Sequence, residues 1–163
     1  MASIGSWAHV LKSQLAVASA RQGEDPLRLA HRVRHLGDAY CYAGRAVLAE
    51  PCYVEALSIY RGHENAPPLD LANAIRSFAV LKDEVGAPKQ SEPLWLEAHD
   101  LYLALKVAAG VAESAARLAL LAREHGDLER SREWLNKAST AAEATDDPET
   151  WQYVRHVAAQ LAT

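Results

Sequence analysis

Cysteine is nearly absent from the sequence, which removes two common ways of holding a fold together. The 163 residues include only Cys41 and Cys52, whose spacing fits neither a disulfide framework nor a zinc site. Two separate thiols are typical of a reducing compartment, so we expect a cytoplasmic protein. The first residues also lack the basic segment that opens a secretory signal, although residues 16–20 resemble a cleavage site.

The sequence also lacks long apolar runs and an excess of basic charge. No stretch is apolar enough to cross a bilayer, and the formal net charge is −4. Proteins that bind nucleic acid usually carry a basic stripe. This chain has one short run of Arg and His between residues 28 and 35, which is typical of a solvated helix face. We therefore predict neither a membrane nor a nucleic acid as partner.

Glycine and proline are scarce as well, with 8 and 7 residues. They stand at spaced points between alanine-rich segments, a pattern that favours helices. Half of the residues are hydrophobic and 23% are charged, a balance typical of a globular protein rather than a disordered one. Length and composition together predict an all-α protein with one domain.

Two segments of the sequence repeat each other at an offset of 42 positions. The segment AEPCYVEALSIY begins at residue 49, and SEPLWLEAHDLY begins at residue 91. The same offset aligns Tyr53 with Trp95 and Gly44 with Gly86, together with other aromatic and small residues. Chance does not readily keep such residues in step over two helices, so we infer a repeating helix pair.

A third copy follows the second at an offset of 40 positions, with Ser131 and Ala138 in the places of Ser91 and Ala98. In every copy a large residue precedes a small one, which lets the paired helix approach closely. These pairs are Leu36-Gly37, Phe78-Ala79 and Leu118-Ala119.

A glycine is predicted to end the first helix of each pair, at Gly44, Gly86 and Gly126, because a helix C-terminus favours positive φ. In the first two copies Pro51 or Pro93 is expected near the start of the second helix, where a missing N–H costs little.

The repeated pattern resembles the tetratricopeptide repeat, in its 42-residue variety of the kinesin-light-chain type. In that type a stretch like A-E-P-x-Y-x-x-A-L opens the second helix, as residues 49–57 do here. The resemblance covers residues 27–143 and departs from the pattern at Lys82 and Ala122, which replace the aromatic that Tyr40 supplies. It implies a right-handed α-solenoid of about three helix pairs with a capping helix at each end, about eight helices in all.

We expect residues 1–163 to form a single tetratricopeptide domain, with repeats at 27–64, 69–108 and 111–144. The remaining segments, 1–24 and 148–163, are predicted capping helices, because a solenoid needs its apolar ends covered. The first of them could equally be the remnant of another repeat. The eight helices are expected at 5–21, 27–43, 46–61, 69–85, 90–107, 111–125, 128–144 and 148–162.

Each end helix is predicted to bury one apolar face against the stack. These faces are Trp7, Val10, Leu11, Leu15 and Ala18 in the first, and Trp151, Val154, Val157, Ala158 and Leu161 in the last. Asp147 before Pro148 predicts an N-cap followed by proline at the first helical position.

The resemblance implies that the first helix of each pair lines a concave groove that binds a peptide or a protein segment. The residues that it places there are His31, Arg34, Asp38, Cys41 and Tyr42 in the first copy, Asn73, Arg76, Val80 and Asp83 in the second, and Glu113, Ala116, Leu120 and Arg123 in the third.

Two residue types carry this binding hypothesis, and each has an alternative. Arg34 and Arg76 could capture a carboxylate or phosphate with their planar forks, or they could pair internally with Asp38 and Asp83. Tyr42 could anchor a peptide, or it could pack against the next helix. The sequence leaves both alternatives open.

One subtype of the family holds the acidic tail of heat-shock chaperones with a clamp of Lys, Asn and Arg, and this sequence does not match it. Asp38 and Ser77 stand at Asn positions and Glu113 replaces a Lys, although Arg34 and Arg117 survive from the clamp. Because carboxylates would face a carboxylate ligand, we reject chaperone-tail binding.

Chemical motifs are missing from the sequence. There is no nucleophile elbow, phosphate-binding loop or paired-cysteine motif, so we predict no catalytic activity and no cofactor. His31 and His35 stand one helical turn apart, a spacing that can hold a metal with Cys41 or Asp38 as a third ligand. The neighbouring Arg charges disfavour a cation, and we predict no metal.

The predicted function is that of a non-catalytic adaptor or scaffold that binds a protein or peptide. One alternative is a sensor that responds to a small molecule or a metal. Another is a structural module that self-associates as a homo-oligomer through its apolar end helices.

Overall fold

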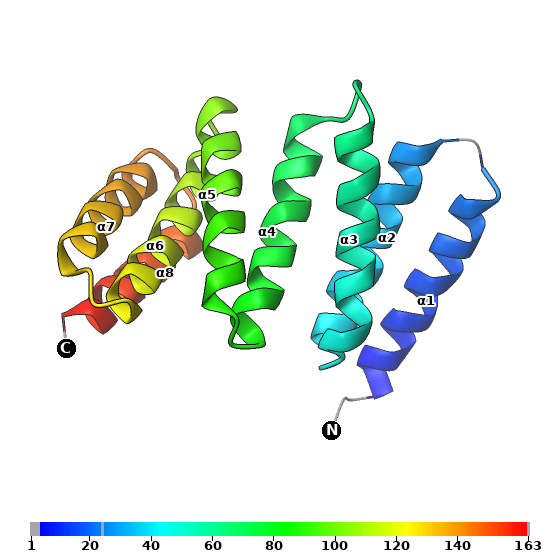
Figure 1. The fold of residues 1–163 in the computed structure, drawn as a ribbon, viewed down its shortest axis with the longest axis horizontal. Helices are drawn as coiled ribbons and strands as arrows, with labels where there is room; N and C mark the ends of the chain where they lie inside the picture. Colours follow the sequence, from blue (N-terminus) through cyan, green and yellow to red (C-terminus); the bar gives the residue numbers. More distant parts are fainter. Residues whose placement is uncertain (1–3, 24, 163) are drawn as a thin grey trace. The chain divides into compact units, whose positions relative to one another are not determined.

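The computed structural model describes residues 4–23 and 25–162, which form eight α-helices and no strand. They divide into two compact units. Unit 1, Met1–Ala87, holds α1 (Ile4–Arg21), α2 (Pro26–Tyr42), α3 (Ala46–Gly62) and α4 (Pro68–Glu84). Unit 2, Pro88–Thr163, holds α5 (Pro88–Ala104), α6 (Ala108–Glu124), α7 (Leu128–Glu143) and α8 (Pro148–Leu161), as Figure 1 shows. The all-α prediction is confirmed.

The unit boundary falls in the turn between α4 and α5, inside the second predicted repeat at 69–108. The division of the chain into one domain with three repeats therefore stays a prediction. Of the predicted segments, residues 1–3, 24 and 163 lie outside the described residues.

Equivalent positions of the repeat are buried alike. Tyr53 and Trp95 are each 1% exposed, as the repeat requires. Gly37 lies so close to α3 that a Cβ there would stand 2.7 Å from Cε1 of Tyr53. The small residues that the repeat places at close contacts are all fully buried, at Ala56, Ala79, Ala98, Ala119 and Ala138. The predicted close approach is thus confirmed for α2 with α3 and for α6 with α7, the pairs that lie within one unit.

Four turns share one backbone geometry, in which a residue with positive φ follows the helix. The next N–H then donates to a carbonyl five residues back, as Arg45 does to Tyr40 at 2.8 Å. Three of the four positions are the predicted glycines, Gly44, Gly86 and Gly126, at φ 68°, 69° and 79°. The fourth, between α5 and α6, is Lys106 at φ 57°.

The sequence prediction of this fourth turn is wrong. It places helices at 90–107 and 111–125, whereas α5 ends at Ala104 and α6 begins at Ala108. Gly110 therefore lies inside α6, where a Cβ would stand 2.5 Å from Cγ of Tyr102. Gly110 thus allows α6 to pack closely against Tyr102 of α5. The turn itself contains Lys106, a residue type that does not predict a turn.

Pro51 and Pro93 lie deeper in their helices than expected. Each is the sixth residue of its helix, α3 or α5. The missing N–H then falls beyond the four that a helix start leaves unpaired. The expectation that it costs little is wrong, because each helix forgoes one internal hydrogen bond.

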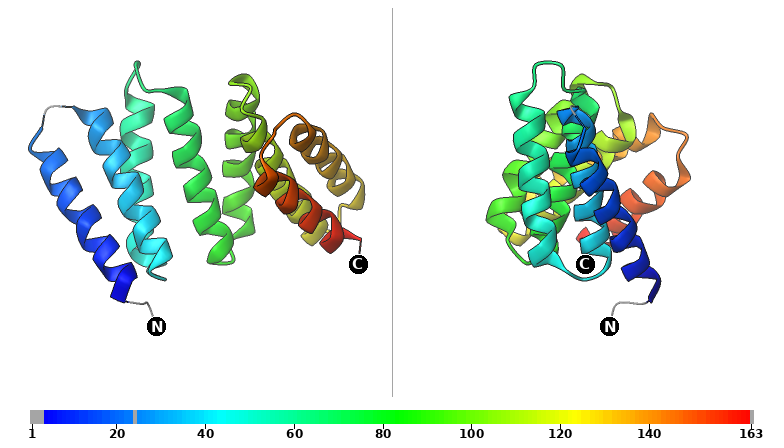
Figure 2. Two further views of the ribbon diagram at one scale, coloured as in Figure 1. Left: turned by 180° about the vertical axis from the view of Figure 1, so that it is seen from behind. Right: turned by 90° about the vertical axis from the view of Figure 1, so that its right-hand side faces the viewer.

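The two end helices differ in how well the sequence predicts them. In α8, Val154 and Val157 are 3% and 1% exposed, and Asp147 caps the helix by accepting from two N–H groups ahead of it. Trp151 is 37% exposed, so its predicted burial is wrong. In α1, which packs beside α2 (Figure 2), Leu11 and Leu15 are 59% and 73% exposed. The predicted α1 face is therefore wrong at Leu11 and Leu15.

Of the side chains predicted for the buried face of α1, only Val10 is fully buried, and Val17 is buried without having been predicted. Val10 and Val17 are 1% and 6% exposed, whereas Trp7 is 38% exposed and Ala18 is exposed. Apolar residues occur on most sides of this helix, so their spacing does not select the buried side.

Candidate functional site

The predicted groove residues lie in both units. Those of the first two copies lie on α2 and α4 in unit 1, and those of the third lie on α6 in unit 2. On α2, four of them are half-buried beside the core stripe of the helix and one is exposed. We call these five residues the α2 row: His31, Arg34, Asp38, Cys41 and Tyr42.

Asp38 is the centre of the polar contacts in the α2 row. Its Oδ2 accepts from Nη1 of Arg34 at 3.0 Å, and its Oδ1 accepts from the hydroxyl of Tyr53 at 2.8 Å. Nη2 of Arg34 lies 2.9 Å from Nε2 of His35. At Arg34 the structure thus has the internal pairing, and the side chain is only 13% exposed.

The buried tyrosines beneath this row differ in their partners. The Tyr53 hydroxyl is bonded to Asp38, and burial together with the Asp38 charge raises the pKa of Tyr53. The Tyr60 hydroxyl and Nε of Arg34 are buried without a hydrogen-bond partner among the described residues. Burial raises the pKa of Tyr60 to about 12. Both phenols therefore stay neutral at physiological pH.

Side chains of α2 and α4 meet on Tyr53. Sγ of Cys41 lies 3.5 Å from its hydroxyl, and the Phe78 ring centroid lies 6.0 Å from the Tyr53 centroid. The predicted α4 residues Asn73, Arg76, Val80 and Asp83 are half-buried. The three polar ones all interact with other groups, so none is unpaired.

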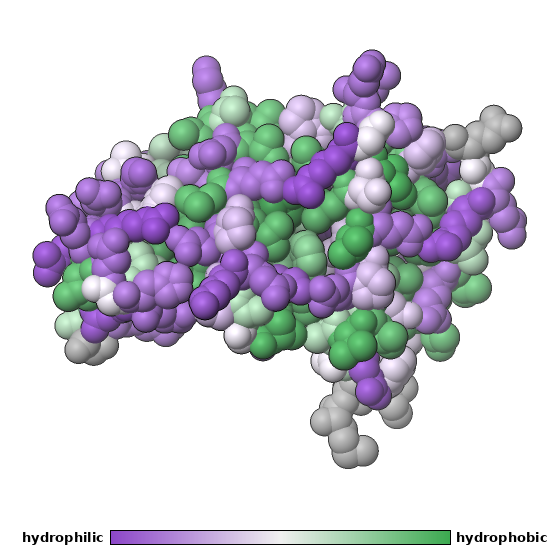
Figure 3. All heavy atoms as spheres, viewed as in Figure 1, coloured by the Kyte–Doolittle hydropathy of each residue, from purple (hydrophilic) through white to green (hydrophobic). Residues whose placement is uncertain are grey.

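Tyr42 extends from the end of the α2 row with 79% of its surface exposed. The alternative that it packs against the next helix is therefore wrong. Other large apolar side chains are exposed on α3, namely Val47, Leu48 and Val54. Figure 3 shows hydrophobic surface over α3 among hydrophilic residues.

The predicted groove residues of α6 make contacts within unit 2. Nη1 of Arg123 donates to the carbonyl of Leu161 at 2.6 Å, and Leu120 packs against the cluster that contains Val154 and Val157. Glu113 is half-buried and has a partner. Ala116 is fully buried, so the expectation that it lines a groove is wrong. Arg123 and Leu120 hold α8 in place.

Metal-binding and nucleophilic groups do not gather here. The His31 and His35 rings are 4.5 Å apart, but no set of three metal-ligand side chains is found among the residues that the structure describes. Burial raises the pKa of the Cys41 thiol, and it raises that of Cys52 to about 11. Both thiols thus remain protonated and weakly nucleophilic at neutral pH.

None of the described helices combines the length and the apolar character that a bilayer span requires.

Comparison with known proteins identifies the fold. No family model and no curated protein matches the sequence. The structure is similar to the crystal structure of BtubC (BKLC) from P. vanneervenii, with a TM-score of 0.72 and 20% sequence identity over 88% of this chain. The fold is that of a kinesin light chain-like tetratricopeptide protein. The match spans 59% of the BtubC chain.

One residue that departs from the tetratricopeptide pattern, Lys82, is buried and has partners on a neighbouring helix and on its own helix. Lys82, at the position of an aromatic residue, is 6% exposed, and its Nζ donates to Oε1 of Glu50 at 2.6 Å. The ammonium also lies 5.0 Å from the centroid of the Phe78 ring. The sequence marks the position as unusual but does not reveal the partner.

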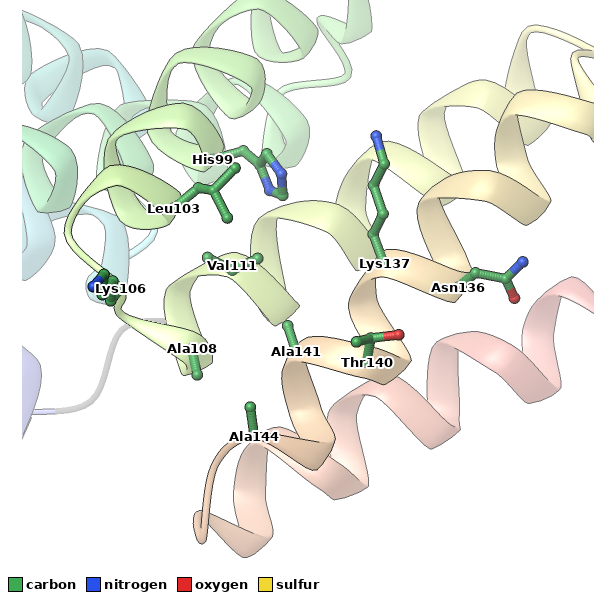
Figure 4. A pocket seen from close by; sticks show the side chains of 10 residues that line it. All are labelled: His99, Leu103, Lys106, Ala108, Val111, Asn136, Lys137, Thr140, Ala141 and Ala144. Atoms are coloured by element: carbon green, nitrogen blue, oxygen red, sulfur yellow. The ribbon is translucent and has the colours of Figure 1, made fainter.

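Sequence reasoning also missed a cavity of about 690 Å³ in unit 2. Figure 4 shows its lining side chains on α5, on the first turns of α6 and on α7. The polar ones are His99, Lys106, Asn136, Lys137 and Thr140. They come from separated segments with no common motif, so no sequence signal joins them.

Proposed function

We propose that the α2 row of unit 1 binds a segment of a partner protein, and that the chain acts as a non-catalytic adaptor. The segment would lie along α2 with an apolar side chain against Tyr42. The predicted residues of α4, and Glu113, Leu120 and Arg123 of α6, remain candidate contacts of the same kind.

The exposure of Tyr42 is the observation that carries this proposal. A tyrosine that is 79% exposed leaves most of its apolar ring in water, although its bulk and few rotamers suit it to binding. Tyrosine is enriched among the residues that dominate binding energies. The ring also lies one helical turn beyond Asp38, so it continues a row of polar side chains.

The hydrogen bonds that hold the polar side chains of the α2 row in place also support the proposal. Arg34 is fixed by Asp38, and Asp38 is fixed by Tyr53, so these side chains have little freedom left to lose when a partner binds. Specificity would come from the polar groups and binding energy from Tyr42. The repeat fold agrees with this role, since helical repeats commonly bind through an extended surface.

The test is a selection of peptides from a random display library with the full chain, followed by calorimetric titration of the enriched peptides. The wild type is compared with Tyr42→Ala. Because Tyr42 makes little contact with the fold, its removal should leave the melting temperature unchanged. Affinity should fall at least tenfold if the ring is an anchor.

Val54→Ala is the matched control, because Val54 is an exposed apolar side chain of the neighbouring α3, at 51%. It should bind the selected peptides as the wild type does. If Tyr42→Ala bound them equally well, or if Val54→Ala lost as much affinity, the α2 row would not be the binding surface.

A further inference from the structure

We propose that the cavity of unit 2 is a binding site for a small organic carboxylate with an apolar body. It involves only residues of α5, α6, α7 and the turn at Lys106, none of which belongs to the α2 row. The inference therefore stands apart from the proposed peptide binding, and either can fail without the other.

The size and lining of the cavity suit an apolar body. Its volume of about 690 Å³ lies within the range of small-molecule sites. The apolar wall is formed by Leu103, Ala108, Val111, Ala141 and Ala144. Leu103 is 58% exposed, so a ligand would cover apolar surface that now faces water.

The charge of the lining suits an anion. Lys106 and Lys137 both line the cavity, and its wall includes no Asp or Glu. Neither lysine forms an ion pair within the described part of the chain, although Nζ of Lys137 lies over the Trp134 ring, 4.0 Å from its centroid. This is notable in a protein whose formal net charge is −4. Two cations without a carboxylate beside an apolar wall are complementary to an amphipathic anion.

The first turn of α6 adds to this positive potential. Ala108 and Val111 of this turn line the cavity, and no side chain caps the helix. The first N–H groups of a helix have no acceptor within it and carry partial positive charge. The lysines and the helix start thus favour the same sign of ligand charge.

Lys106 itself occupies an unfavourable backbone conformation. The three equivalent turns have glycine with φ between 68° and 79°, whereas Lys106 has φ 57°. A side chain at this position costs folding free energy that glycine would avoid. The turn geometry therefore does not explain the lysine, whose position on the cavity wall is consistent with the proposed site.

His99 forms a neutral, fixed part of the wall. It is 5% exposed, its Nδ1 lies 3.1 Å from Oγ of Ser114, and its ring meets Trp134 edge to face at 5.0 Å. Ser114 donates to the carbonyl of Gly110 at 2.7 Å, so its oxygen can accept from Nδ1 of His99. Burial lowers the pKa of His99, so the two lysines supply the charge.

A small molecule fits these observations better than a peptide. The cationic groups and the apolar wall belong to one cavity bounded by three helices, not to a row along a helix. A carboxylate at either lysine with its chain against Leu103 and Val111 would use both features at once. An acidic peptide is the competing occupant and is distinguished in the test.

The experiment is calorimetric titration of the full chain with decanoate below its micelle-forming concentration, beside decanol, acetate and an acidic amphipathic peptide. Saturable binding of one decanoate per chain is expected. Decanol lacks the charge and acetate lacks the chain, so each should bind at least tenfold more weakly.

The variants are Lys106→Gly, Lys137→Gln and, as control, Lys89→Gln. Lys89 is an exposed lysine of α5 that does not line the cavity. The first two should each weaken decanoate binding at least threefold, and the control should not. Lys106→Gly should also raise the melting temperature by roughly 2–4 °C, since glycine relieves the turn. Weaker binding in a more stable protein cannot result from misfolding.

Three results would overturn the proposal. They are the absence of saturable decanoate binding, equal affinity for decanol and decanoate, and unchanged decanoate affinity in both cavity variants. Binding of the acidic peptide without decanoate would assign the cavity to a protein partner instead.

Discussion

The cations of the α2 row in unit 1 and of the cavity in unit 2 differ in whether a carboxylate partners them. Arg34 is paired with Asp38, which in turn accepts from Tyr53, so this charge is part of the folded structure. Lys106 and Lys137 line an apolar cavity without a carboxylate. The comparison shows that a cation in a repeat protein indicates a ligand site only when its partners within the fold are known.

A close glycine–aromatic contact underlies both regions and should give the largest effect. A Cβ would stand 2.7 Å from the Tyr53 ring at Gly37 and 2.5 Å from the Tyr102 ring at Gly110. We expect Gly37→Ala and Gly110→Ala each to lower the free energy of unfolding by about 2–3 kcal/mol. Urea denaturation measures this. Gly62→Ala, with no atom within 4 Å, is the control, and equal stability of all three variants would contradict the packing.

Removing one charged group from each region tests whether the charges of the α2 row stabilise the fold more than the lysines of the cavity do. Asp38→Ala leaves the mostly buried Arg34 without its carboxylate and Tyr53 without its acceptor, so we expect a loss of about 2 kcal/mol. Lys137→Gln breaks no ion pair and removes only the cation–π contact with Trp134, so its effect should stay within about 1 kcal/mol. Thermal and urea unfolding of both variants measure the difference. Similar losses in the two would remove the distinction between a charge held in an ion pair and a charge without a carboxylate partner.

The two buried tyrosines of α3 test the polar contacts of the α2 row more finely. Tyr53→Phe should cost about 1 kcal/mol, because Asp38 loses a donor. Tyr60→Phe removes a buried hydroxyl without a partner among the described residues, so stability should hold or rise slightly. The measurement is urea unfolding of both variants under one set of conditions. A larger loss in Tyr60→Phe than in Tyr53→Phe would contradict the assigned hydrogen bonds.

The smallest expected effect is a dependence on pH in unit 2. Burial lowers the pKa of His99 below its ordinary 6.5, so the unfolded chain takes up a proton that the folded chain resists. The contribution to stability is full above pH 6.5 and declines as the pH falls toward the lowered value. His99→Gln should show a smaller decline than the wild type over this range in urea unfolding. Parallel curves would contradict a buried neutral imidazole.

Much of the fold could be predicted from the sequence because its signals are local. Gly44, Gly86 and Gly126 mark three turns, and Asp147 before Pro148 marks the start of α8. The turn at Lys106 was not predictable, because it has the same backbone geometry as the other three turns but no glycine at the position of positive φ.

The candidate sites depend on partners distant in sequence and were predicted less completely. The helical spacing of the α2 row was predictable, and the Arg34–Asp38 pair was one of two alternatives. The hydroxyl of Tyr53, which comes from another helix, is needed to see how Asp38 is satisfied. The cavity was not predictable, because Lys106 and Lys137 line one cavity only once α5, α6 and α7 are packed.

The central claim is that the α2 row and the unit 2 cavity are separate sites with different ligands. An NMR titration of the ¹⁵N-labelled chain with a selected peptide, and then with decanoate, tests it most directly. The peptide should shift amide signals of α2 around Tyr42, and decanoate should shift those around His99, Lys106 and Lys137. If both ligands shifted the same signals, the two sites would not be separate, and if the peptide left α2 unchanged, the α2 row would not be its binding surface.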